Sequence, residues 1–248
     1  MLDGKTKVVA IVQARMGSTR LPGKVLLDLA GRTMLARVVR RVARAALVEE
    51  VVVATTDSPD DDPIVEECRR LPVACFRGNE DDVLDRFQQA ATAFQADVVV
   101  RITADCPLID PEVTDLVIRA FLDHRPDYAS NTLRRTYPRG LDTEVIAAAA
   151  LAHASREASE PYQRVHVTPY LYQYPELFRL LAVTGSEDLS RHRWTVDSPQ
   201  DLRFARAVYR QMGGVDAFSW HDVGRLVAEE PTLADLNRDV RHKELVEG

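Results

Sequence analysis

The chain has 248 residues, of which 46% are hydrophobic and 28% are charged, and its formal net charge is −6. These values are typical of a globular protein with a sizeable core, and the acidic balance argues against a nucleic-acid-binding protein, which usually carries a basic excess. No segment approaches the ~20 consecutive apolar residues of a membrane span, so we expect neither a nucleic acid nor a membrane among its partners.

In the first half of the chain, short apolar runs alternate with segments of helical periodicity. The apolar runs predict strands over residues 8–13, 51–55, 73–76 and 97–102. The periodic segments predict helices over residues 33–46, 60–71, 81–94 and 111–124. This alternation predicts an α/β fold with parallel strands and helices on both faces of the sheet. Ligands of such folds bind beyond the carboxyl ends of the strands.

After about Tyr128 the pattern becomes less regular. We expect an irregular hairpin or lid at 133–140, strands at 141–146, 178–183 and 192–196, helices at 147–159, 162–172, 198–211 and 219–230, and a partly frayed tail after Pro231. Neither a Gly/Ser-rich linker nor an internal repeat is present. We therefore expect a single domain over residues 1–248, with an inserted arm at about 130–175.

The cysteines and the first residues bear on the compartment. Cys68, Cys75 and Cys106 have neither disulfide-framework nor zinc spacing, which favours a reducing compartment. The first residues, 1–5, do not begin a signal peptide, because no long apolar region follows their charges. We expect a cytoplasmic protein.

The loop at residues 14–24 directly follows the first predicted strand and reads ARMGSTRLPGK. Glycines and cations in a strand-to-helix connection are typical of anion binding, although each cation taken alone would be a solvated turn residue. Gly17 and Gly23 enclose five residues, and Lys24 precedes a valine, so the loop is not a P-loop. The G-x-G-x-x-G pattern of dinucleotide binding is also absent. The loop predicts a phosphate site of another kind.

Two aspartates follow apolar runs. Asp105 comes after the strand predicted at 97–102, on the same edge of the sheet as the loop, and Asp197 comes after the strand predicted at 192–196. Each is followed within two residues by a proline, and a single aspartate at such a place is most often a helix cap. Carboxylates are the ligands that Mg²⁺ prefers. The pair beside a phosphate loop favours a magnesium site, while a capping role for Asp197 stays open.

The loop closely resembles the A-R-x-x-S-T-R-L-P-G-K loop of cytidylyltransferases that activate acidic sugars, the acylneuraminate and ulosonate group. The segments VVATTD at 52–57, RGNEDDVLDR at 77–86, TADCPLI at 103–109 and WTVDSPQDL at 194–202 are similar to motifs of the same family, with Ala104 in place of the usual glycine. The strings YPRGLDTEV at 137–145 and RVHVTPYLY at 164–172 resemble the members linked to spore-coat and other surface polysaccharides, with Val165 in place of an acidic residue.

This resemblance implies a mostly parallel, Rossmann-like nucleotidyltransferase sheet and a homodimer. It implies that CTP and an acidic sugar give a CMP-sugar and pyrophosphate, with Mg²⁺ held by Asp105 and Asp197. The catalytic residues that it implies are Arg15, Lys24, Asp105 and Asp197. The nucleotide-binding residues are expected to be Ala14, Arg15, Ser18, Arg20, Lys24, Arg86 and Thr103.

For the acceptor sugar we expect contacts from Arg139, Asp142, Glu144 and His166. Asp142 and Glu144 lie two apart on a predicted strand and hence on one face, which suits a hydroxyl-rich ligand, a cation or a partner arginine as well as a solvated edge. The guanidinium of Arg139 suits a carboxylate, although a solvated arm or a dimer contact is an alternative. His166 taken alone would more often be a structural histidine.

Two other functions remain open from the sequence. A glycosyltransferase that uses a nucleotide-sugar has a similar sheet, but it usually carries D-x-D after a central strand, where this chain has Ala-Asp-Cys at 104–106. A non-catalytic nucleotide-binding protein is the other alternative. The presence of both aspartates and of the loop cations argues against it.

Overall fold

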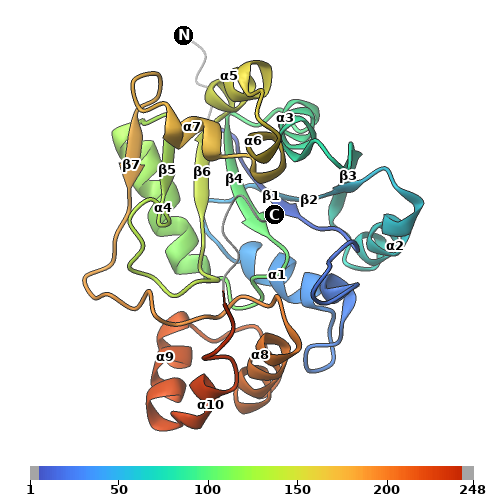
Figure 1. Ribbon diagram of the computed structural model, residues 1–248, viewed down its shortest axis with the longest axis vertical. Coiled ribbons are helices and arrows are strands. Elements are labelled where there is room, and N and C mark those ends of the chain that lie inside the picture. The colour runs from blue at the N-terminus through green and yellow to red at the C-terminus, as the bar shows by residue number, and fades with distance from the viewer. Residues whose placement is uncertain (1–5, 242–248) are drawn as a thin grey trace.

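The computed structural model describes residues 6–241 and contains a seven-stranded sheet in the order β3-β2-β1-β4-β6-β5-β7 (Figure 1). The strands are β1 Val8–Gln13, β2 Glu50–Thr56, β3 Ala74–Gly78, β4 Val98–Thr103, β5 Tyr128–Ser130, β6 Glu144–Ala147 and β7 Leu180–Ala182. All pairings are parallel except those of β6, which is antiparallel to β4 and to β5. The predicted mostly parallel α/β sheet is confirmed.

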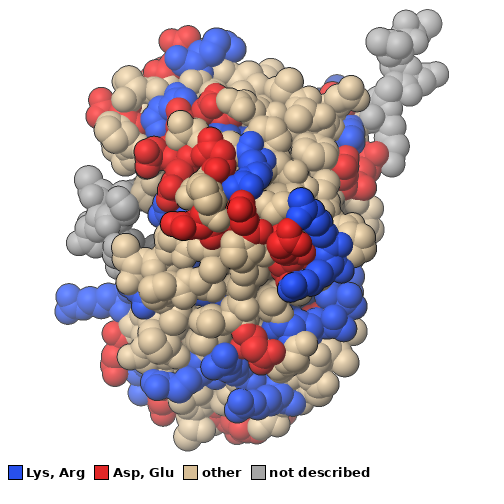
Figure 2. Space-filling model, turned by 90° about the vertical axis from the view of Figure 1, so that its right-hand side faces the viewer, with Lys and Arg blue, Asp and Glu red and all other residues tan. Residues whose placement is uncertain are grey.

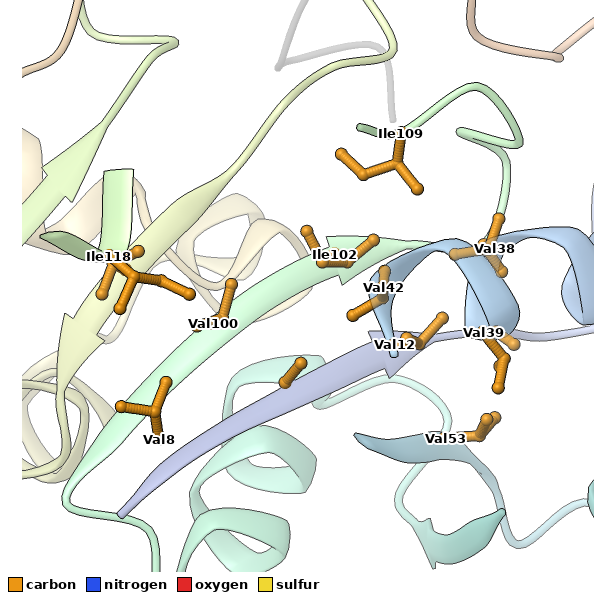
Figure 3. Packing of buried hydrophobic residues seen from close by; sticks show 14 of the residues in the cluster. Val8, Val12, Val38, Val39, Val42, Val53, Val100, Ile102, Ile109 and Ile118 are labelled. Carbon is orange, nitrogen blue, oxygen red and sulfur yellow. The ribbon is translucent and has the colours of Figure 1, made fainter. Parts of the chain in front are cut away.

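Helices cover both faces of the sheet, because successive residues of each strand point to opposite sides. Val8, Ala10 and Val12 of β1 pack in one cluster with side chains from α1 Met34–Val42, α2 Asp62–Arg70 and α4 Pro111–His124. Figure 3 shows this layer, with Val100 and Ile102 of β4 facing the helices. The intervening residues of β1 pack on the other face against α3 Val83–Ala93, α5 Ala148–Glu157 and α7 Pro169–Gln173.

A third hydrophobic cluster lies next to the sheet, among α8 Pro199–Gln211, α9 Trp220–Glu229 and α10 Thr232–Asp235 (Figure 1). The segment that leads into α8 is attached to the carboxyl end of β4, where the backbone N–H of Val196 donates to the carbonyl of Asp105 at 2.8 Å. This attachment brings the two predicted metal ligands to one place although they are far apart in the sequence.

The structure corrects several predicted elements of the second half. Residues 192–196 are not a strand, since only a single bridge, Arg139 with Arg193, forms there. The helix predicted at 162–172 is divided into α6 Pro161–His166 and α7, because Pro169 lacks an N–H and Val167 has a φ of 73°. Strand β6 begins only at Glu144, and the three-residue strand β5 was not predicted, because so short a run carries no periodicity.

The arm predicted at about 130–175 contributes to the body of the protein. Strand β6 lies within the sheet, and α5 and α6 pack against α3. The assignment of residues 1–248 to a single domain stays a prediction. The ends of that range lie outside the described residues, and so does the segment 1–5 for which no signal peptide is expected. Part of the tail expected to fray after Pro231 forms α10, while residues 242–248 are outside the described range. Among the described helices, none combines the length and apolarity needed to cross a bilayer.

Candidate active site

The loop at 14–24 and the Asp105 segment meet at one edge of the sheet, as the sequence predicts. Strands β1 and β4 are parallel neighbours, and Gln13 at the end of β1 lies opposite Thr103 at the end of β4. Both connections therefore leave from the same carboxyl edge. The Nζ atom of Lys24 donates a hydrogen bond to Oδ2 of Asp105 at 2.8 Å, which shows that the two segments touch.

Backbone hydrogen bonds fix the conformation of the loop. The N–H of Ala14 donates to the carbonyl of Ala54 on β2 at 3.1 Å, and the N–H of Gly23 donates to the carbonyl of Met16 at 3.0 Å. Gly23 has a φ of 65°, a left-handed conformation that favours glycine. The chain then enters a short 3-10 turn, η1 Lys24–Leu26, in which the side chain of Lys24 is buried. The backbone hydrogen bond from Gly23 to Met16 therefore closes the loop just before Lys24, whose side chain points toward Asp105 and Asp197.

Asp61 holds this loop against β2, a role that no sequence signal singled out from the run of acids at 60–62. Its carboxylate is buried and accepts hydrogen bonds from the N–H of Met16 at 2.7 Å, from both hydroxyls of Thr55 and Thr56, and from the N–H of Thr56. Burial raises the pKa of Asp61, but the hydrogen bonds from Thr56 and Met16 outweigh it and lower the pKa below its ordinary value.

Replacing Asp61 by asparagine is expected to raise the KM for the nucleotide about 10-fold, with a smaller effect on kcat. An amide offers only one acceptor oxygen to four donors, and a hydrogen bond to a charged acceptor contributes about 1.5–3 kcal/mol. Steady-state kinetics with the nucleotide as the varied substrate measures this change. Asp60→Asn is the control, since Asp60 is exposed on the same turn. An unchanged KM in a folded Asp61→Asn protein would show that the loop does not need this anchor.

Lys24, Asp105 and Asp197 form the centre of the site. The Nζ atom of Lys24 lies 2.8 Å from Oδ2 of Asp105 and 2.8 Å from Oδ1 of Asp197, and it also donates to the carbonyl of Val196 at 2.9 Å. Arg20 approaches the same oxygen of Asp197, with Nη2 at 3.1 Å. Two carboxylates from different segments therefore face a single cationic group.

The charges of this centre stabilise one another. Burial raises the pKa of Asp197, but the positive charge of Lys24 and the hydrogen bonds from Lys24 and Arg193 outweigh it and lower the pKa to about 2. Burial lowers the pKa of Lys24, while Asp105 and Asp197 raise it by more, so that its net shift is upward. Lys24 and Asp197 are consequently both charged at neutral pH.

The two carboxylates suit a hard divalent cation. Their oxygens already surround a positive charge, the Lys24 ammonium group, and Mg²⁺ in nucleotide sites is commonly held by one or two carboxylates together with phosphates and water. Within residues 6–241 no group of three or more His, Cys, Asp or Glu side chains is arranged to hold a metal. The magnesium assignment to Asp105 and Asp197 therefore stays a prediction that depends on phosphate oxygens as further ligands.

Asp197 is not the helix cap that the sequence left open. Ser198 is the N-cap of α8, and it forms a reciprocal capping pair with Asp201. Arg193, which the sequence reading did not single out, instead donates from Nη2 to Asp197 at 2.7 Å and from Nε to Asp201 at 2.9 Å. Its position four residues before Asp197 is the only signal of this role. Arg193 thus fixes the direction in which Asp197 points.

The other predicted nucleotide contacts line the same edge. Arg15 is exposed, and Ser18 and Thr103 are half-buried. Arg86 is fully buried on α3, and its Nη1 donates to the carbonyl of Asn79 at 2.6 Å, while its Nε and Nη2 have no partner among the described residues. Burial and the charge of Arg15 lower the pKa of Arg86 to about 10. Buried donors without partners are costly unless a ligand satisfies them.

Acidic side chains surround this part of the surface. The face that carries α2 and β3 mixes acidic and basic side chains (Figure 2). Several carboxylates before and at the start of α2 and after β3 are exposed, namely Asp57, Asp60, Asp62, Glu80 and Asp81. The loop at 14–24 and Arg86 are therefore the cations expected to face a phosphate ligand here, since the surrounding face is of mixed charge.

The predicted acceptor residues do not form one cluster through direct contacts. Asp142 precedes β6 and accepts two hydrogen bonds from Arg135, at 2.6 and 2.8 Å, so it does not share a strand face with Glu144. Glu144 is buried, pairs with Arg101, and accepts from the hydroxyls of Tyr128 at 2.7 Å and Thr168 at 2.9 Å. The solvated-edge alternative is therefore wrong for Glu144.

His166 and Arg139 occupy separate positions. His166 is the last residue of α6 and is half-buried. Arg139 pairs through its backbone with the segment before α8, since its N–H donates to the carbonyl of His192 at 2.9 Å and its carbonyl accepts from the N–H of Trp194. Gly140 permits this approach, because a Cβ there would lie 2.6 Å from the carbonyl carbon of Trp194. The pairing carries Arg139 close to Arg193.

A cationic loop and paired carboxylates, placed at the carboxyl edge of a mostly parallel sheet, define a nucleotidyltransferase. The comparisons with known proteins specify the class further. A family model described as cytidylyltransferase matches residues 9–217. The chain belongs to this cytidylyltransferase family.

Individual relatives agree with the family. The spore coat polysaccharide biosynthesis protein SpsF of Bacillus subtilis is 35% identical over 234 residues, which cover 92% of this chain and 96% of that protein. A 3-deoxy-manno-octulosonate cytidylyltransferase of Anaeromyxobacter dehalogenans is 34% identical over 227 residues, covering 83% and 91% of the two chains. The solved structure of a cytidylyltransferase from Leptospira borgpetersenii superposes with a TM-score of 0.90 at 32% identity, covering 96% of this chain and all of that one.

Proposed function

We propose that the protein is a magnesium-dependent cytidylyltransferase that transfers CMP from CTP to an acidic sugar of the ulosonic or nonulosonic type for surface polysaccharide synthesis. The observation that carries the proposal is the position of the Lys24 ammonium group, 2.8 Å from both Asp105 and Asp197 and directly after the cationic loop. A carboxylate pair able to hold a cation thus lies beside a loop suited to a triphosphate. Membership of the cytidylyltransferase family supports CTP as the donor.

The reaction is a substitution at the α-phosphorus. A hydroxyl oxygen of the sugar forms a bond to the α-phosphorus of CTP, the bond from that phosphorus to the bridging oxygen breaks, pyrophosphate leaves, and the hydroxyl proton passes to solvent. The protein contributes mainly positioning and charge neutralisation. Arg15, Arg20 and Lys24 hold the triphosphate and the departing pyrophosphate, and the unpartnered donors of Arg86 bind the nucleotide.

Asp105 and Asp197 are the residues that would hold Mg²⁺. When bound, the metal supplies positive charge at the α-phosphate and lowers the pKa of the attacking hydroxyl. With a cation on the two carboxylates, the Lys24 ammonium group that now pairs with both would be available to bind phosphate oxygens. Arg193 keeps Asp197 in the required orientation.

The remaining expectations belong to the same proposal. Asp142, Glu144 and His166 are assigned to contacts with the acceptor sugar, and the protein is assigned to the cytoplasm as a homodimer. For Glu144 the support is its central place in a hydrogen-bond network that joins β4, β5 and α7 near the site. A twofold dimer is the commonest assembly among soluble homo-oligomers.

Pyrophosphate release measured with four nucleoside triphosphates against a panel of acidic sugars tests this function. Release is expected with CTP, only when an acidic sugar and Mg²⁺ are both present. A glycosyltransferase would release no pyrophosphate from CTP. Magnesium-dependent CTP binding without turnover of any acceptor would indicate a non-catalytic nucleotide-binding protein and overturn the proposal.

A further inference from the structure

A cavity of about 920 Å³ lies beside the carboxylate centre. It is enclosed by residues 136–139, by the segment 185–194 that leads toward Asp197, and by helices α8, α9 and α10. Its volume falls within the roughly 300–1,000 Å³ typical of small-molecule sites. None of the predicted triphosphate-binding residues lines this cavity, so it is a space distinct from the anion loop.

Arg193 connects the cavity to the centre. Its side chain is only 10% exposed; Nη2 and Nε bind Asp197 and Asp201, and Nη1 is buried without a partner among the described residues. Arg193 also lines the cavity. A buried guanidinium donor without a partner is unfavourable in the free protein and points to a ligand that accepts its hydrogen bond.

Arg139 provides a second cation in the same wall. Its guanidinium is half-buried, and no hydrogen bond or ion pair of its side chain to another described residue is found. Burial and the like charges of Arg135 and Arg193 lower the pKa of Arg139, with Asp142 offsetting part of the effect. Two neighbouring guanidinium groups of this kind gain most from an anion with a planar, two-oxygen end, which the arginine fork binds bidentately.

Part of the remaining wall is aromatic. Trp220 packs edge-on against Tyr137, with ring centroids 5.5 Å apart, and lies 3.9 Å from the ring of His221. All three side chains line the cavity, together with Trp194. Aromatic rings with polar edges suit a ligand that presents both C–H surface and hydroxyl groups. A sugar ring that carries a carboxylate combines these properties.

We infer that this cavity binds the carboxylate end of the acceptor sugar, with the carboxylate on Arg139 and Arg193 and the ring against Trp220. The inference rests on the proposed function and names a subsite within it. Because Arg193 contacts both the cavity and Asp197, an acceptor bound here lies next to the group that is proposed to hold the metal. The Arg193 side chain would then contact the acceptor and Asp197 at the same time.

Intrinsic fluorescence offers a direct test, because the two tryptophans of the chain, Trp194 and Trp220, both line the cavity. The probes are 3-deoxy-manno-octulosonate and N-acetylneuraminate, each compared with its uncharged methyl ester, and magnesium is omitted so that no turnover occurs. At least one acid is expected to change the fluorescence saturably and to bind at least about 10-fold more tightly than its ester, a difference of ~1.4 kcal/mol.

Arg139→Gln is the informative variant, since the Arg139 side chain has no hydrogen-bond or ion-pair partner within residues 6–241 whose loss would destabilise the protein. It is expected to weaken binding of the acid about 10-fold or more and to leave binding of the ester unchanged. Arg225→Gln, an exposed arginine of α9 that does not line the cavity, is the matched control. Failure of both acids to give a saturable change, equal affinity for acid and ester, or wild-type binding by Arg139→Gln would each overturn the inference.

The outcome is separable from that of the proposed function. If CTP and an acidic sugar release pyrophosphate but Arg139→Gln leaves the KM of that sugar unchanged, the cytidylyltransferase activity stands and the cavity assignment falls. If no sugar supports pyrophosphate release but an acid binds the cavity through Arg139, the cavity assignment stands as a sugar-acid site and the proposed reaction falls.

Discussion

Replacing Asp197 by asparagine is expected to lower kcat at least about 100-fold while the protein stays folded. The substitution keeps an oxygen for Lys24 and Arg193 but removes the negative charge that they and the proposed Mg²⁺ require. Loss of one preorganised electrostatic group at a reacting phosphate or oxyanion costs ~2.7–4 kcal/mol of transition-state stabilisation. Asp105→Asn is expected to behave in the same way, because Asp105 faces the same ammonium group.

Pyrophosphate release measures the activity, and calorimetric titration of Mg²⁺ in the presence of CTP measures the metal affinity, which is expected to fall in both variants. The pKa of Asp197 is about 2, so its carboxylate is ionised across the neutral range and the loss is expected not to depend on pH there. Asp123→Asn, an exposed carboxylate of α4, is the control. Near-normal turnover in a folded Asp197→Asn protein would remove the metal assignment.

Replacing Arg41 by alanine is expected to lower the free energy of unfolding by about 3–5 kcal/mol. Arg41 is fully buried on α1 and donates to three carbonyls, those of Ile109 at 2.6 Å, Asp216 at 2.8 Å and Phe218 at 3.1 Å. Its guanidinium lies 4.2 Å from the centre of the Phe218 ring and 3.6 Å from Asp110. Truncation removes three hydrogen bonds to backbone carbonyls and the charged partner of the buried Asp110 carboxylate, which keeps only its backbone donors. Such losses are among the most destabilising known.

Urea unfolding followed by circular dichroism gives this free energy. Arg40→Ala is the matched control, because Arg40 is the preceding residue of the same helix but is half-exposed. Its side chain has one partner among the described residues, Asp216, with which it forms an ion pair at 2.9 Å. Its loss is expected to cost less than ~1 kcal/mol. If Arg41→Ala were as stable as Arg40→Ala, the buried arginine would not be what joins α1 to the segment between α8 and α9.

Arg41→Ala tests how the C-terminal helices are attached, and Asp197→Asn tests the charge that they bring to the site. Arg41 and its neighbours attach the C-terminal helices to α1, and through α8 they carry Asp197 to the edge of the sheet. A destabilised attachment is therefore expected to displace Asp197 from Lys24, whereas Asp197→Asn leaves the attachment intact. Asp197→Asn is therefore expected to lower turnover without lowering stability, whereas Arg41→Ala is expected to lower both.

The elements predicted best are those whose signals are local. The β-branched run at 97–102 and the apolar run at 8–13 form central strands, because residues buried on both faces of a parallel sheet must all be apolar. The loop at 14–24 directly follows the strand at 8–13, and its composition predicts an anion site. Asp105 and Asp197 were placed together from motifs and from their positions after predicted strands, although the strand predicted at 192–196 does not form.

Elements whose stability comes from distant partners were predicted poorly. Residues 192–196 are apolar enough for a strand, but they run beside residues 139–140 with only one bridge and instead fill the third cluster through Trp194 and Val196. The antiparallel insertion of β6 between β4 and β5 likewise depends on long-range pairing. The periodicity within either segment does not indicate which distant segment it will pair or pack with.

The sequence by itself determined the fold class and singled out the loop at 14–24 and the two aspartates, because strand burial, loop composition and short motifs are properties of neighbouring residues. Only the tertiary structure decided which side chains contact the loop and the two aspartates and fix their positions. Lys24 and Asp197 are 173 positions apart, yet their atoms are 2.8 Å apart. Asp61 and Arg193 became recognisable as the anchors of the loop and of Asp197 only through their contacts. Tertiary packing decides which distant residues form hydrogen bonds, and the pattern of neighbouring residues in the sequence does not specify that packing.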